Sequence, residues 1–171
     1  MSPDESFLAE LLRGLEGVGL EAIVVGTAAA ALQGAPVMTQ DIDLLVRETP
    51  KNREKIERLC EVLGGAKPVE VSALSPTVTL LGLPIPVDLL FGTLPPGLSF
   101  EAVRARSVRV PVGNRVAVVA CLADVVASKE AAGRPKDLAQ LPILRDTLRV
   151  RGALPGDGEP KPPSAPGSSG A

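Results

Sequence analysis

The sequence contains no histidine among its 171 residues. A Ser-His-Asp triad, a histidine-ligated zinc site and imidazole acid–base catalysis are therefore excluded. Any chemistry that this chain performs must rely on carboxylates, lysines and hydroxyl groups.

Cysteines and aromatic residues are scarce as well. The two cysteines, Cys60 and Cys121, lie far apart and form no C-x-x-C motif, so neither a disulfide framework nor a zinc site is indicated. We expect two reduced, mostly buried thiols in a cytoplasmic protein. Three phenylalanines, with no tryptophan or tyrosine, cannot provide a platform on which several nucleic-acid bases stack.

An excess of basic residues and a long apolar run are also missing. The net charge of -2 excludes a surface that is basic throughout, so a nucleic-acid contact would need a local patch. The first residues, MSPDESFLAELL, carry acids where a signal peptide carries bases, and the longest uncharged window, 22–40, is interrupted by glycines and a proline. We therefore expect neither export nor membrane insertion.

The residues that are present alternate between strand and helix patterns. Helices are predicted at about 3–17, 27–34, 50–64, 99–104 and 122–132, with a further one from Pro135 that breaks or restarts at Pro142. Strands are predicted at 21–26, 41–46, 77–82 and 85–92, and a hairpin at 107–119 turns at Gly113-Asn114, with Pro111 confining its strand to an edge or a bulge. The pattern predicts an α/β fold with a small mixed sheet flanked by helices and a short C-terminal helical segment from about residue 122.

The chain is expected to form one domain, 1–150, followed by a tail. Of the last 20 residues, 16 are Gly, Pro, Ser or Ala. Such a composition cannot bury enough apolar area to offset chain entropy. We predict that 151–171 is a disordered tail.

The most informative segment is TQDIDLLV, residues 39–46, where two acids interrupt an apolar strand. Because residues i and i+2 point to the same face of a strand, Asp41 and Asp43 project together while Ile42 and Leu44 point to the other side. Two adjacent carboxylates repel each other unless a cation compensates, and hard oxygen ligands suit Mg²⁺. An isolated D-x-D pair is, however, also typical of solvated acids at strand edges.

Two other features lie on either side of this pair in sequence. Gly26-Thr27 ends a strand and opens a helix, where free backbone N–H groups bind anions, although a turn glycine and a capping threonine give the same pattern. Asp88 is an acid inside the apolar strand IPVDLLF, where it could also pair with a nearby base. If that strand lies beside 41–46, three carboxylates share one site, an arrangement that suits phosphoryl transfer with two metal sites.

Gly26-Thr27, a spacer of 13 residues, Asp41-Ile42-Asp43-Leu44 and the later Asp88 resemble the signature of the DNA polymerase β-type nucleotidyltransferase superfamily in its minimal bacterial form. The resemblance covers about 22–92. It implies a nucleotidyltransferase fold, a nucleoside triphosphate substrate held by Gly26 and Thr27, Mg²⁺ bound at Asp41, Asp43 and Asp88, and Asp88 as the base that activates an acceptor hydroxyl. Where the family usually has Gly-Ser or Gly-Gly, this chain has Gly-Thr, which keeps a hydroxyl.

A second segment, ASKEAAGRPKDLAQL, residues 127–141, is similar to the C-terminal stretch of nucleotidyltransferases from bacterial toxin–antitoxin and abortive-infection systems. The similarity implies that Lys129 and Lys136 contact nucleotide phosphates, that Asp137 positions the acceptor or a base, and that Arg134 contributes less. Acids that merely pair with neighbouring bases in a solvated connector would give the same pattern.

The acceptor stays open at the level of sequence. The C-terminal similarity favours an RNA such as tRNA, with a cognate toxin or antitoxin protein as a partner. The alternatives are a tyrosine on a partner protein, a hydroxylated antibiotic, and a non-catalytic module that binds a nucleotide or a partner. Arg104, Arg106, Arg109 and Arg115 could follow a nucleic-acid acceptor or could simply be solvated.

Overall fold

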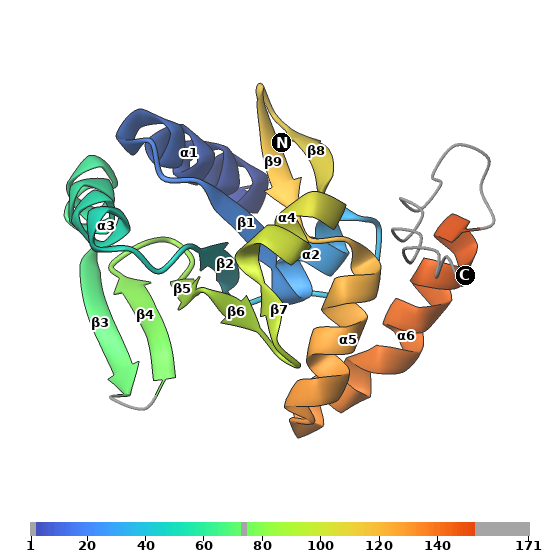
Figure 1. Cartoon of the computed structure of the whole chain (residues 1–171). Coiled ribbons are helices and arrows are strands. Elements are labelled where there is room, and N and C mark those ends of the chain that lie inside the picture. The colour runs from blue at the N-terminus through green and yellow to red at the C-terminus, as the bar shows by residue number, and fades with distance from the viewer. Residues whose placement is uncertain (1–2, 73–74, 153–171) are drawn as a thin grey trace, which may run out of the picture.

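A computed structural model of the chain describes residues 3–72 and 75–152. It confirms the predicted α/β fold, with helices packed around a mixed sheet (Figure 1). The helices are α1 (Pro3–Val18), α2 (Gly26–Leu32), α3 (Pro50–Val62), α4 (Phe100–Arg106), α5 (Leu122–Ala132) and α6 (Pro135–Gly152). The strands are β1 (Ala22–Val25), β2 (Ile42–Val46), β3 (Lys67–Ser72), β4 (Ser75–Leu81), β5 (Val87–Phe91), β6 (Thr93–Leu94), β7 (Leu98–Ser99), β8 (Val108–Val112) and β9 (Arg115–Val119).

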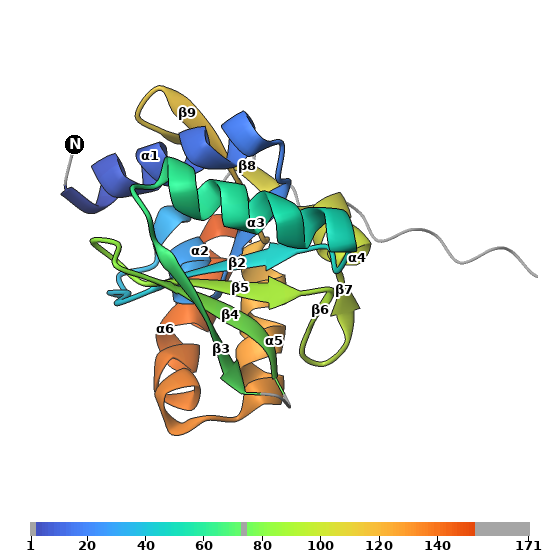
Figure 2. The same ribbon diagram turned by 90° about the vertical axis from the view of Figure 1, so that its left-hand side faces the viewer.

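Seven strands form one twisted sheet in the order β3-β4-β5-β2-β1-β9-β8. The β2–β5 and β1–β9 pairs are parallel, and the other pairs are antiparallel. Helices α1 and α3 lie on one side of the sheet, and α5 and α6 lie on the other (Figures 1 and 2). The short β6–β7 hairpin stands apart from the main sheet.

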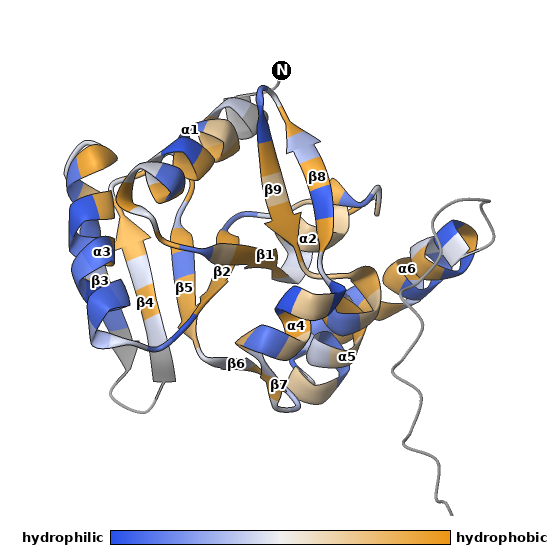
Figure 3. Ribbon diagram, turned by 45° about the horizontal axis from the view of Figure 1, so that its top comes forward, coloured by the Kyte–Doolittle hydropathy of each residue, from blue (hydrophilic) through white to orange (hydrophobic). Residues whose placement is uncertain are grey.

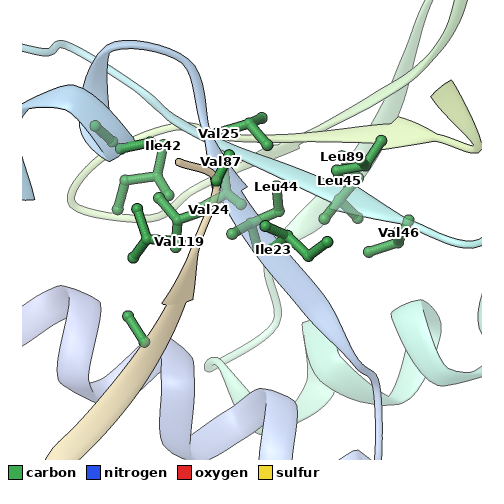
Figure 4. Packing of buried hydrophobic residues seen from close by; sticks show 14 of the residues in the cluster. Ile23, Val24, Val25, Ile42, Leu44, Leu45, Val46, Val87, Leu89 and Val119 are labelled. Carbon is green, nitrogen blue, oxygen red and sulfur yellow. The ribbon is translucent and has the colours of Figure 1, made fainter. Parts of the chain in front are cut away.

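The centre of the sheet is the most buried part of the molecule. Ile23, Val24 and Val25 of β1 and Leu44 and Leu45 of β2 are at most 2% exposed, because these strands have neighbours on both edges and the sheet has helices on both faces (Figures 1 and 2). Figure 4 shows how these side chains pack together. Apolar residues dominate β1, β2 and β9 in Figure 3, whereas α3 carries hydrophilic residues on its outer side. Apolar burial in the middle of the sheet thus provides a rigid base for the polar residues at the strand ends.

Most predicted elements are found, but three strands were not expected. Strand β3 has the sequence KPVEVS, in which a proline and charged residues obscure the β pattern. These residues are tolerated because β3 is an edge strand. The two-residue strands β6 and β7 are too short to produce a periodic signal. Pro111 lies on the opposite edge strand, β8, as predicted.

The predicted break at Pro142 is wrong. Helix α6 continues through Pro142 to Gly152. Proline at this position removes the hydrogen bond to the carbonyl of Leu138. Both residues lie on the exposed side of the helix, where water can satisfy that carbonyl.

The boundary of the predicted tail also shifts. Arg151 and Gly152 belong to α6, and the Arg151 guanidinium donates a hydrogen bond to the carbonyl oxygen of Gln33 at 3.0 Å. The rest of the predicted tail, 153–171, lies outside the described residues. Within the described part of the chain, no helix has the length and apolarity required to cross a bilayer.

Candidate active site

The parallel pairing of β2 and β5 brings the predicted carboxylates together. Asp43 and Asp88 are register partners on the two strands, and Asp41 directly precedes β2. Ile42 and Leu44 are buried at 4% and 1% exposure on the opposite face, as the alternation predicts. The three acids therefore face one cavity.

Gly26 brings the backbone directly against this group of acids. Its φ is +64°, a conformation that costs little for glycine alone. A Cβ atom added here would lie 2.3 Å from the Asp43 carboxylate oxygen Oδ2. Both the turn and the close approach therefore require glycine at the junction of β1 and α2.

The acids repel one another. Burial raises the pKa of Asp43 to about 7, and the carboxylates of Asp41 and Asp88 add to the rise, while Lys129 and Lys136 partly offset it. Keeping Asp43 ionised in the folded protein therefore costs free energy, and a bound cation would lower that cost.

Hydroxyl groups position the two flanking acids. The Thr39 hydroxyl donates to the backbone oxygen of Asp41 at 2.6 Å, and the Thr79 hydroxyl donates to Asp88 Oδ1 at 2.5 Å. Sequence analysis identified neither threonine. The role of Thr79 depends on the register of β4 with β5, which the sequence does not specify.

The opposite wall of the cavity is a polar network on α2, α5 and α6. Lys129 Nζ donates to Thr27 Oγ1 at 3.0 Å and to Asp137 Oδ1 at 2.9 Å, and Arg134 Nε donates to Asp137 Oδ2 at 2.5 Å. Lys129 and Asp137 are 7% and 1% exposed. Burial would raise the pKa of Asp137, but the hydrogen bonds from Lys129 and Arg134 lower it.

Gln140 is a further member of this network that sequence analysis missed. Its Oε1 accepts a hydrogen bond from the Thr27 hydroxyl at 3.1 Å. Gln140 follows Lys136 by four residues in α6, so both lie on one helix face, and this spacing was the available signal. Because Thr27 bonds to α5 and α6, it is a link between helices and not the helix cap that was the alternative interpretation; α2 has no side-chain cap.

The two walls enclose a cavity of about 610 Å³. All eight predicted site residues line it: Gly26, Thr27, Asp41, Asp43, Asp88, Lys129, Lys136 and Asp137. Arg134 and Gln140 line it too. Segments that are more than 100 residues apart in the sequence thus converge on one site.

The donor chemistry at this site fits Mg²⁺, since carboxylate oxygens are its usual protein ligands. Asp41 and Asp43 would hold the ion, with Asp88 as a third ligand. Within 3–72 and 75–152, no three Asp, Glu, Cys or His side chains are grouped as a metal site. The fit therefore rests on the kind of donors and on the raised pKa of Asp43.

The basic region proposed as a nucleic-acid contact is largely engaged with acids. Arg104 pairs with Glu21, Arg106 with the buried Asp124, and Arg115 with Glu16. These three ion pairs join the hairpin and α4 to neighbouring elements. Their charge is largely compensated within the chain.

The sequence matches no protein-family profile and no curated protein at a significant level. Solved structures do match. The solution structure of the antibiotic-resistance factor ANT(2'')-Ia aligns with a TM-score of 0.63 at 14% identity, over 85% of this chain and 84% of that chain. Its crystal structure in complex with adenylyl-2''-tobramycin gives 0.63 at 13%, over 86% and 90%.

A suggested nucleotidyltransferase from Thermotoga maritima aligns with a TM-score of 0.57 at 21% identity, over 88% of this chain and 96% of that chain. Identities this low carry information about architecture alone. The chain has the nucleotidyltransferase fold.

Proposed function

We propose that this protein transfers a nucleoside monophosphate from a nucleoside triphosphate to an acceptor hydroxyl group. The observation that carries the proposal is the single cavity in which Asp41, Asp43 and Asp88 face Lys129 and Lys136. Carboxylates on one wall and cations on the other suit a substrate that is a metal-bound polyphosphate. The fold shared with ANT(2'')-Ia supports the same reaction class.

Different residues bind the triphosphate and accept the proton of the acceptor. Backbone N–H groups at Gly26 and the cations Lys129 and Lys136 bind the triphosphate. Asp88 Oδ2 accepts the proton of the acceptor hydroxyl, while Thr79 holds the other oxygen of that carboxylate. The acceptor oxygen forms a bond to the α-phosphorus, the bond from that phosphorus to the bridging oxygen breaks, and pyrophosphate leaves with the electron pair.

The charge of the cavity favours a divalent cation bound together with this substrate. Its charged lining residues are four acids, Asp41, Asp43, Asp88 and Asp137, and three bases, Lys129, Arg134 and Lys136, which gives a net charge of -1. A triphosphate, itself an anion, would be repelled by such a site. Mg²⁺ bound at Asp41 and Asp43 would neutralise the acids and polarise the phosphate oxygens.

The acceptor was expected to be an RNA in a toxin–antitoxin setting. The engaged arginines, Arg104, Arg106 and Arg115, reduce the support for an RNA surface, because phosphate contacts require uncompensated cations. The fold shared with ANT(2'')-Ia favours a small hydroxylated acceptor, such as an antibiotic. A non-catalytic nucleotide-binding module would not need an acid at the position of Asp88.

The test is transfer of label from each α-labelled ribonucleoside triphosphate, with Mg²⁺, into RNA, protein and small-molecule pools. We expect labelled product and released pyrophosphate, and an approximately 1,000-fold loss with Asp43→Asn. Glu48→Gln, an exposed acid two residues after β2, is the matched control and should retain activity. Pyrophosphate release that is equal in Asp43→Asn and in the wild type would refute the proposal.

A further inference from the structure

The hydroxyl group of Thr27 lies at the centre of the polar network on α2, α5 and α6. It accepts a hydrogen bond from Lys129 Nζ at 3.0 Å and donates one to Gln140 Oε1 at 3.1 Å. Because an ammonium group can only donate, the Thr27 oxygen must be the acceptor in the first bond. The proton of the hydroxyl group is directed to the amide oxygen of Gln140.

A hydroxyl group has a single proton, which limits what Thr27 can bind. The ionised oxygens of a triphosphate are hydrogen-bond acceptors and therefore need a donor. While the proton of Thr27 is directed to Gln140, Thr27 has none to offer them. This arrangement differs from the direct contact with the triphosphate that the sequence resemblance implies for Thr27.

Lys129 can supply the donor that Thr27 lacks. Its ammonium group has three protons, and the bonds to Thr27 Oγ1 and Asp137 Oδ1 use two of them. One proton remains for a ligand in the cavity that Lys129 lines. The two bonds also hold the ammonium group in one orientation, so Thr27 and Asp137 set the direction of the third proton.

Gln140 is placed beside Thr27 by the geometry of α6. It follows the buried Asp137 by three residues, so both side chains lie on one face of the helix. Gln140 is half-buried and lines the cavity. Its amide is uncharged, so it accepts the proton of Thr27 without adding to the negative charge of the cavity. A glutamate would accept the same proton but would repel the triphosphate.

We propose that Gln140 is a positioning residue for nucleotide binding. By accepting the proton of Thr27, it keeps the Thr27 oxygen directed to Lys129, and Thr27 in turn directs the remaining proton of Lys129 to the triphosphate. Thr27 therefore acts on the phosphates through Lys129 and not by direct donation. The proposal rests on the nucleotidyl transfer proposed above and specifies how that site holds its triphosphate.

Direct donation by Thr27 predicts the opposite effect of removing Gln140. If the Thr27 hydroxyl donated to a phosphate oxygen, Gln140 would compete for the same proton, and its removal would leave binding unchanged or make it tighter. If Gln140 positions Thr27 for Lys129, its removal must weaken binding. The sign of the change in affinity therefore separates the two roles of Thr27.

The experiment measures the affinity of the full chain for tripolyphosphate with Mg²⁺ by isothermal titration calorimetry. Tripolyphosphate contains the phosphate chain that all nucleoside triphosphates share, so the test does not depend on the base. The test variants are Gln140→Met, Thr27→Val and their combination. The matched control is Thr147→Val, because the Thr147 hydroxyl bonds to the carbonyl oxygen of Ile143 within α6, and Thr147 is not part of the cavity lining.

We expect the dissociation constant to rise about fivefold to tenfold in Gln140→Met and in Thr27→Val, as for the loss of one hydrogen bond, and to stay unchanged in Thr147→Val. The double variant should bind no more than about twofold more weakly than Thr27→Val, because both substitutions act through Lys129. Thr27→Ser retains the hydroxyl group and should bind as the wild type does.

Thermal denaturation followed by circular dichroism shows whether each variant is folded. If Gln140→Met does not fold, Gln140→Ala removes the same acceptor and should cause the same loss of affinity. A lower melting temperature with unchanged affinity would mean that Gln140 serves the packing of α6 alone, and this result would overturn the proposal.

Unchanged or tighter binding by Gln140→Met, or additive losses in the double variant, would also overturn the positioning role while leaving nucleotidyl transfer standing. A wild type that binds tripolyphosphate but releases no pyrophosphate from any nucleoside triphosphate would instead refute the proposed function, and the affinities of the variants would still decide the role of Gln140. Absence of tripolyphosphate binding by the wild type would overturn both.

Discussion

The two walls of the cavity differ in how completely their charges are satisfied within the protein. On α5 and α6, the buried Lys129 and Asp137 bond to each other and to Thr27 and Arg134. On β2 and β5, burial and mutual repulsion raise the pKa of Asp43 to about 7. The buried charges of the first wall are paired within the protein, whereas the carboxylates of the second repel one another, and a proton or a cation would reduce that repulsion.

This difference predicts how substitutions on each wall change the stability of the protein. A buried ion pair loses most when one partner is removed, because the other charge is left without compensation. A cluster of like charges behaves in the opposite way, because removing one acid relieves the others. Substitutions on the two walls should therefore change stability in opposite directions.

The largest effect is expected for Lys129→Met. The change leaves the buried carboxylate of Asp137 with Arg134 as its remaining ion-pair partner, whose side chain is 61% exposed. We expect the free energy of unfolding to fall by about 3 kcal/mol. Urea denaturation followed by circular dichroism measures it, since the chain has no tryptophan.

Two further variants sharpen this result. Lys129→Met combined with Asp137→Leu should regain most of the stability without regaining nucleotide binding. Lys136→Met, at an exposed lysine of the same cavity, should weaken nucleotide binding and change stability by less than about 0.5 kcal/mol. If the double variant is as unstable as Lys129→Met, the pair is not what stabilises this wall.

Gly26→Ala should have the next largest effect, because Gly26 links the two walls. The added Cβ atom would meet the Asp43 carboxylate at 2.3 Å, and the φ of +64° is unfavourable for alanine. We expect a loss of about 2 kcal/mol in stability, measured by thermal denaturation, and a loss of nucleotidyl transfer.

Gly64→Ala separates these two causes. Gly64 follows α3, has a φ of +81° and has no neighbouring atom within 4 Å of the position of a Cβ. Its substitution should cost about 1 kcal/mol through backbone strain alone and leave transfer unchanged. Equal effects on transfer at the two glycines would mean that the contact with Asp43 is irrelevant.

The sequence was sufficient to predict the two strands that carry the acids and insufficient to predict the residues around them. Asp41 and Asp43 were found because a strand exposes alternate residues, and this rule requires no knowledge of the fold. The contact between Thr79 and Asp88, by contrast, depends on a β4–β5 register that is set by packing. Strand β3 was missed because edge strands tolerate proline and charge.

The smallest effect concerns the pH dependence of stability without metal. The folded protein keeps the proton of Asp43 up to about pH 7, whereas the unfolded chain releases it near the ordinary value of 3.8. Between these values the folded state binds more protons, so its stability must fall as pH rises from about 4 to about 7 and then level off. Because Asp43 is partly exposed, the change should be about 1 kcal/mol.

Other groups titrate in part of this window, so the difference between Asp43→Asn and the wild type is the quantity to measure. Asp124 also has a pKa raised by burial, and it contributes equally to both proteins. Denaturation at intervals from pH 4 to pH 8 should give a difference that grows in favour of Asp43→Asn as pH rises. Mg²⁺ should remove most of this difference at pH 8 by stabilising the wild type alone, because the cation compensates the carboxylates in place of the proton. A difference that is independent of both pH and Mg²⁺ would mean that repulsion among the carboxylates on β2 and β5 does not destabilise the protein when no ligand is bound.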